Sequence, residues 1–246
     1  WKGLLDKLLP APGKVTKTTH FQALPYAQLP VFMEQLVGQE GMGAKALLFL
    51  ILTAARSGEV RGATWDEIDL AARVWTIPGE RMKASKAHRV PLSDAVIALL
   101  EEMKALALAA GRTTGKAYVF PSPNSRDPEL GSALSDMTLT AVLRRLKLEA
   151  VPHGFRSTFR DWCAEQTDYP NEVAEMALAH AVGNKVEAAY RRGDLLAKRQ
   201  QLMQDWADYA LGRSAGNMTV GHSSVPLAST RAHTSDQSNN TEGAKQ

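Results

Sequence analysis

The segment 44–55 constrains the fold most, because its side chains are apolar on nearly every side and not along one stripe only. A helix of this kind is stable in water only when other elements surround it, so we expect it at the centre of a helical domain. The segment contains Lys45 and Thr53, and it is shorter than the roughly 18–20 apolar residues that span a bilayer. It leads into Arg56, so this arginine is expected where the buried helix ends.

Apolar residues at spacings of three and four predict further helices along most of the chain. We expect these helices in the segments 26–37, 93–108, 135–148, 155–165, 171–180, 185–190 and 194–211. The stretch 111–134 lacks the pattern and is expected to be mostly loop.

The segment 73–92 has a different period. β-Branched and aromatic residues at 74–77 favour a strand, and a Pro-Gly pair then turns the chain. The segments 81–83 and 88–92 are expected to form two more short strands around a basic turn. The predicted fold class is therefore mainly α with a small antiparallel β-sheet (α+β).

Composition divides the chain into three parts. Residues 1–20 are expected to be a linker, because two prolines and a glycine within 10–13 interrupt any helix. Residues 21–211 are expected to form the main domain. Residues 212–246 are rich in Ser, Thr, Asn, Gly and Gln and contain no aromatic residue, which predicts a disordered polar tail. The sequence starts with Trp1, and we expect it to be a fragment.

Charge and cysteine content narrow the class of protein. The net charge of +3 permits a nucleic-acid partner without requiring one. The single cysteine, Cys163, excludes an intrachain disulfide and favours a reducing, cytoplasmic setting. The histidines 88, 153 and 180 lack metal-ligand spacing, and no acidic cluster resembles a two-metal site, so we expect neither metal nor cofactor.

Two arginines, two histidines and a tyrosine suit one task together: Arg56, His153, Arg156, His180 and Tyr190. Arginine forks can hold a phosphodiester, and histidine can donate or relay a proton. A phenol can supply the oxygen nucleophile when positive charge surrounds it. Each residue alone has a plainer interpretation, such as a solvated surface pair or a cation at a helix end. The ordered set is harder to obtain by chance and predicts metal-free attack on a phosphodiester.

Lys83 and Glu59 extend this set. Lys83 is expected on the basic turn, where it could protonate a leaving oxygen or simply contact a phosphate, and Lys86 competes for that role. Glu59 could orient Arg56 or a nearby histidine, or form only an exposed ion pair. Basic residues near these positions are expected to follow a DNA backbone: Arg81, Lys86, Arg89, Arg191 and Arg192.

In these residues the chain resembles the tyrosine recombinase family, in particular the integrases of temperate bacteriophages and genomic islands. The matching runs are Ala-Arg-Ser-Gly-Glu at 55–59, Met-Lys at 82–83, His-Arg-Val-Pro-Leu-Ser at 88–93, His-Gly-Phe-Arg at 153–156, Leu-Ala-His at 178–180 and Ala-Ala-Tyr-Arg-Arg at 188–192. The resemblance runs from about residue 20 to residue 211. It implies the integrase catalytic-domain fold, preceded by a DNA-binding region that is missing here and to which residues 1–20 would be the linker.

The resemblance also implies a role for each residue. Arg56 and Arg156, with His180, would hold the phosphate oxygens, and Lys83 would protonate the leaving 5′ oxygen. His153 would assist proton transfer, while Tyr190 would attack and form a 3′-phosphotyrosyl bond. The implied function is site-specific recombination of double-stranded DNA, which integrates or excises a mobile element. Self-association on DNA, as a tetrameric synapse of the full-length protein, is the implied assembly.

Three other functions fit parts of the pattern. A type IB topoisomerase would use the same chemistry to relax supercoiled DNA. A non-catalytic regulator would bind DNA without forming a covalent adduct. A helical scaffold would use the arginines only for surface ion pairs.

Overall fold

A computed structural model describes residues 22–180 and 193–213. The expected linker 1–20, most of the expected tail and the expected helix 185–190 lie outside the described residues. None of the described helices is long and apolar enough to cross a membrane.

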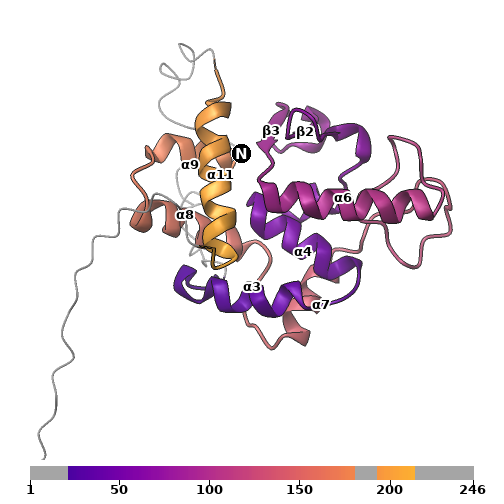
Figure 1. Cartoon of the computed structure of the whole chain (residues 1–246), viewed down its shortest axis with the longest axis horizontal. Coiled ribbons are helices and arrows are strands. Elements are labelled where there is room, and N and C mark those ends of the chain that lie inside the picture. The colour runs from indigo at the N-terminus through magenta and orange to yellow at the C-terminus, as the bar shows by residue number, and fades with distance from the viewer. Residues whose placement is uncertain (1–21, 181–192, 214–246) are drawn as a thin grey trace, which may run out of the picture.

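Helix α4 (Met42–Thr53) lies at the centre of the fold, as its all-round apolar sequence predicts. It contacts the helices α3 (Leu29–Val37), α6 (Asp94–Ala109), α7 (Thr138–Arg145) and α11 (Leu196–Ala210). Eight of its twelve residues are buried. This surrounding of α4 confirms the prediction of a helical core, and Figure 1 shows α3 and α6 on either side of it.

The end of α4 differs from the expectation by a few residues. The helix ends at Thr53, and Ala54 adopts the left-handed conformation with φ of 50°. Arg56 is then extended and precedes the short helix α5 (Ser57–Arg61). Arg56 therefore lies at a helix N-terminus, and not at the end of α4 as the sequence suggested. Its charge is compensated by Glu59, which is buried one turn into α5.

The sheet has three antiparallel strands in the order β1 (Ile68–Asp69), β2 (Val74–Ile77) and β3 (His88–Pro91). Strands β2 and β3 are confirmed, with Ile77 paired to His88. The expected strand 81–83 is wrong: this stretch turns through a 3₁₀ segment, η3 (Gly79–Arg81), and leads into a loop. The third strand is β1, which precedes β2 and is only two residues long. A second 3₁₀ turn, η2 (Trp65–Glu67), leads into β1.

A second group of helices packs on the first through aromatic side chains. It comprises α8 (Gly154–Gln166), α9 (Asn171–Ala177) and α11, which lie together in Figure 1 beside the α4 group. The ring of Trp206 lies 5.2 Å from the rings of Phe159 and Trp162. Its indole nitrogen donates to the Ile51 carbonyl of α4 at 2.8 Å. This contact fixes α8 and α11 relative to α4.

The first turn of α8 lies directly against the start of the described chain, which includes the 3₁₀ turn η1 (Tyr26–Gln28). A Cβ on Gly154 would meet the Gln22 carbonyl oxygen at 2.1 Å, so only glycine fits there. The Val151 amide donates to the same carbonyl at 3.1 Å. The segment before η1 thereby fixes where α8 begins.

Candidate active site

Arg156 connects the ends of two helices. Its guanidinium is buried and donates from Nη1 to the Ala54 carbonyl and from Nη2 to the Leu178 carbonyl, both at 2.6 Å. Ala54 ends α4, and Leu178 directly follows α9. The arginine is thus held by backbone that belongs to distant parts of the sequence.

Arg56 lies beside Arg156. Its Nη1 forms an ion pair with Glu59 at 2.7 Å, and its Nη2 makes a longer contact of 3.5 Å to the same Leu178 carbonyl. The Glu59 carboxylate also accepts the backbone N–H of Arg56 at 2.7 Å. Burial, and then repulsion from Arg56, lowers the pKa of Arg156 to about 10. The Arg156 guanidinium therefore remains charged at neutral pH, and the Leu178 carbonyl holds it close to the Arg56 guanidinium.

His180 joins this pair at the end of the described segment. Its Nε2 lies 3.1 Å from Nη2 of Arg156, and its Nδ1 lies 2.7 Å from the Glu175 carboxylate. The Arg160 Nε donates to the other Glu175 oxygen at 2.6 Å. The sequence predicted that His180 would lie on a helix, but α9 ends at Ala177, and Ala179 turns the chain with φ of 49°.

His153 precedes α8, and its side chain is exposed. Partial burial lowers its pKa, and the charges of Arg156, Arg56 and His180 lower it further. His153 therefore lies in the same positive field as the other three residues. The structure thus brings Arg56, His153, Arg156 and His180 to one place.

His88 and Glu175 are two residues of this region whose part in it was not predicted. His88 is the first residue of β3 and hydrogen-bonds to the Ala177 carbonyl. Burial lowers its pKa to about 4, and Arg199 and Arg156 contribute to the shift against the opposing effect of Glu59. The sequence offered one signal for His88, its place in the run 88–93. No sequence pattern singled out Glu175, because its partners Arg160 and His180 are brought to it only by the packing of the helices.

The basic residues expected to contact DNA differ in their surroundings. Lys83 and Lys86 are exposed in the loop between β2 and β3. Arg81 is turned inward, where it pairs with Glu67 and donates to the Glu59 carbonyl. Arg89 forms a two-pronged pair with Asp194 at 2.7 and 2.8 Å. Tyr190, Arg191 and Arg192 lie outside the described residues.

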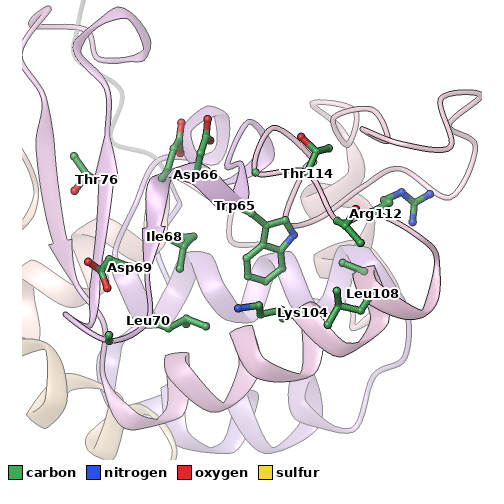
Figure 2. A pocket seen from close by; sticks show the side chains of 15 residues that line it. Trp65, Asp66, Ile68, Asp69, Leu70, Thr76, Lys104, Leu108, Arg112 and Thr114 are labelled. Atoms are coloured by element: carbon green, nitrogen blue, oxygen red, sulfur yellow. The ribbon is translucent and has the colours of Figure 1, made fainter.

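A separate hollow of about 710 Å³ lies between the sheet and α6. Figure 2 shows the Trp65 indole between Ile68 and the part of α6 that carries Lys104 and Leu108. Arg56, His153, Arg156 and His180 do not line it. We favour the arginine cluster as the candidate site, because two adjacent guanidiniums suit a phosphodiester, whereas this hollow contains both carboxylates and cations along its walls. Among the residues that the structure describes, no group of three His, Cys, Asp or Glu could hold a metal ion.

Comparison with known proteins assigns the family. The model of the phage integrase family matches residues 26–195. The chain belongs to this family. It is 36% identical over 199 residues to prophage integrase IntA of Escherichia coli K12, and 32% identical over 213 residues to the integrase of Enterobacteria phage P4. Each match covers 79% of this chain and 46% of the relative, so the chain spans about half the length of the curated relatives it matches.

Solved structures of low sequence identity share the fold. The integrase from mycobacterium phage Brujita matches with a TM-score of 0.57 and 16% identity, over 82% of this chain and 63% of its own. The XerH site-specific recombinase, solved bound to difH substrate, matches with a TM-score of 0.52 and 17% identity, over 76% of this chain and 60% of its own. The predicted integrase catalytic-domain fold is confirmed by these neighbours and by the helical architecture.

Proposed function

We propose that this chain carries the catalytic site of a site-specific recombinase, which cuts and rejoins double-stranded DNA. The observation that carries the proposal is the pair of guanidiniums on the Leu178 carbonyl, with two histidines beside them. Confined cations of this kind bind and stabilise a phosphoryl group that gains a second negative charge. Membership of the phage integrase family and the shared fold of XerH, a site-specific recombinase, support the same function.

In the proposed reaction, the Tyr190 phenol attacks the DNA phosphodiester and forms a 3′-phosphotyrosyl bond. Arg56, Arg156 and His180 hold the non-bridging oxygens, and Lys83 gives a proton to the 5′ oxygen that leaves. His153 assists proton transfer at the tyrosine. The energy of the broken bond is kept in the new one, so the reaction needs no cofactor. Loss of one electrostatic donor should lower the rate about 10²–10³-fold.

Glu59 serves this mechanism by holding Arg56. It accepts hydrogen bonds from both the backbone and the side chain of Arg56, so the guanidinium is fixed before DNA binds. The proposed partner is double-stranded DNA, whose backbone would also contact the exposed Lys86 and, with Tyr190 in place, Arg191 and Arg192. Self-association on DNA and a cytoplasmic setting belong to the same proposal.

Trapping the covalent adduct tests the chemistry. The chain is incubated with nicked duplexes of randomised sequence, from which the cleaved strand diffuses away, and protein–DNA adducts are resolved on a denaturing gel. Wild type should form the adduct, and Tyr190→Phe should form none. Tyr169→Phe is the matched control, because this phenol is already bound to Asp205 at 2.6 Å. An adduct that persists in Tyr190→Phe would remove this tyrosine from the mechanism.

Salt dependence and DNA topology separate the remaining alternatives. Backbone binding predicts that affinity falls with salt at a slope of about 0.9 per neutralised phosphate. DNA binding without an adduct would point to a regulator, and relaxation of supercoiled plasmid without strand transfer would point to a topoisomerase. No DNA affinity at low salt would refute the proposal altogether.

A further inference from the structure

Both ring nitrogens of His180 have hydrogen-bond partners within the chain, and these partners fix where the proton lies. Nε2 faces the Arg156 guanidinium at 3.1 Å, a group that can only donate hydrogen bonds. Nδ1 faces the Glu175 carboxylate at 2.7 Å, which can only accept when ionised. The ring must therefore be neutral and must carry its single proton on Nδ1.

Glu175 is ionised under these conditions. Burial acts to raise its pKa, but hydrogen bonds from Arg160 and His180 outweigh that effect and lower it. The backbone N–H of His180 also donates to the Glu175 carbonyl at 3.0 Å, which closes a turn around the ring. Two helices therefore hold this carboxylate, α9 through the chain and α8 through Arg160.

The neutral His180 ring in this arrangement cannot donate a hydrogen bond from Nε2 to a phosphate. A non-bridging phosphate oxygen accepts hydrogen bonds, and so does the bare Nε2 of neutral His180. To donate to the phosphate, Nε2 must first gain a proton. The Arg156–Nε2 hydrogen bond must break at the same time, which frees one N–H of Nη2 for the phosphate while the other stays on the Leu178 carbonyl.

We propose that Glu175 is a positioning residue that sets the tautomer of His180, so that anion binding in this site takes up one proton from solution. A new N–H bond forms at Nε2, the imidazolium is held between Glu175 and the anion, and no electrons are transferred. The proposal rests on the proposed function, because it assumes that the phosphate binds between Arg56, Arg156 and His180.

The charges around His180 explain why the anion triggers the uptake. Arg156 lies 3.1 Å from Nε2 of His180 and shares the Leu178 carbonyl with Arg56, while Arg160 is paired with Glu175. Glu59 is occupied by Arg56. The charge of a bound anion is then what tips the balance towards the imidazolium.

Nitrogen NMR of the imidazole ring tests this without DNA or catalysis. Protein labelled with ¹⁵N-histidine is titrated with sodium sulfate at about pH 7.5, with sodium chloride of equal ionic strength as reference, and His180→Gln assigns the signals. We expect the Nδ1–H tautomer in chloride and the doubly protonated ring in sulfate. Sulfate affinity should decline as the pH rises.

Charge-specific variants separate positioning from mere structure. Glu175→Gln should lower the sulfate-induced protonation of His180 about tenfold or more, whereas Glu175→Asp should retain most of it. Glu165→Gln is the matched control and should change nothing. Glu165 lies on the same helix as Arg160, and its carboxylate accepts a hydrogen bond from the Tyr26 hydroxyl. A proton on Nε2 in chloride, a neutral ring in bound sulfate, or equal effects of Gln and Asp at 175 would overturn the proposal. If the NMR titration gives the expected result but no DNA adduct forms, only the recombinase function is refuted.

Discussion

Acidification should destabilise the fold through His88, the histidine at the start of β3. Its side chain is partly buried, hydrogen-bonds to the Ala177 carbonyl and lies near Arg199 and Arg156. Burial and these two cations disfavour its protonated form, and its pKa falls from the ordinary 6.5 to about 4. In the unfolded chain the same ring protonates with its ordinary pKa. Between these two values the unfolded state binds more protons, so folding stability is lost as the pH falls.

The magnitude follows from the two pKa values. If the ring is fully protonated in the unfolded chain and neutral in the folded chain, the free energy of unfolding falls by about 3 kcal/mol. Each unit of difference between the two pKa values corresponds to about 1.4 kcal/mol. Lowering the pH from about 7 to about 5 covers only part of the interval between the two pKa values. The free energy of unfolding then falls by about 2 kcal/mol because of His88. A loss of this size is a large fraction of the stability of an ordinary domain.

Urea unfolding of two proteins measures this loss. Wild type and His88→Gln are unfolded at about pH 7 and about pH 5, and the transition is followed by fluorescence of the five tryptophans. The glutamine can still donate to the Ala177 carbonyl but does not titrate. Other histidines and carboxylates contribute equally to both proteins, so the difference between the two pH dependences isolates His88. Wild type should lose about 2 kcal/mol more than the variant. Equal losses, with unchanged denaturant slopes, would show that His88 is not held neutral in the fold.

Three further outcomes follow from described contacts. Gly154→Ala should destabilise the chain by about 3 kcal/mol, because the new Cβ meets the Gln22 backbone, whereas Gly58→Ala, with open space around its Cβ, should be nearly neutral in the same urea assay. Trp206→Phe should cost about 2 kcal/mol in thermal or urea unfolding, because it removes the hydrogen bond to the Ile51 carbonyl; a change below about 0.5 kcal/mol would contradict this. Burial raises the pKa of the Cys163 thiol well above its usual range, so a thiol-specific reagent should modify it only at the rate of unfolding, and rapid labelling of the native chain would refute its burial.

Much of the helical architecture could be predicted because its signals are local. The segment 44–55 is apolar on every side, and only a central position satisfies such a helix. The strand at 74–77 follows from its β-branched and aromatic residues, and the start of the helix after Ser93 follows from the residues next to it. These patterns do not depend on which distant elements meet.

The misplaced elements depend on distant partners. Arg81 lies in a turn because its guanidinium pairs with Glu67 and the Glu59 carbonyl, and no local pattern of residues reveals these partners. The left-handed turn at Ala179 places His180 beyond the end of its helix. It could not be predicted, because the position carries neither the glycine nor the asparagine that usually indicates such a turn.

The candidate site was only partly predictable for the same reason. Arg56, His153, Arg156 and His180 were found from residue type and order, because phosphate chemistry requires arginine and histidine whatever the fold. Glu175 and His88 act through packing, so their parts in the site became visible only in the structure. The role of Tyr190 rests on the sequence alone, since this residue lies outside the described chain.

The shared Leu178 carbonyl has a consequence for how such a site evolves. Two like charges are confined side by side, and the folding of the surrounding helices must overcome their repulsion. Replacing Arg56 and Glu59 together by apolar residues would relieve that repulsion without leaving the buried Glu59 carboxylate unpaired, so it could raise fold stability while abolishing the proposed reaction. Selection for fold stability alone would therefore remove this pair, and its persistence in a lineage would support the proposed DNA cleavage and rejoining.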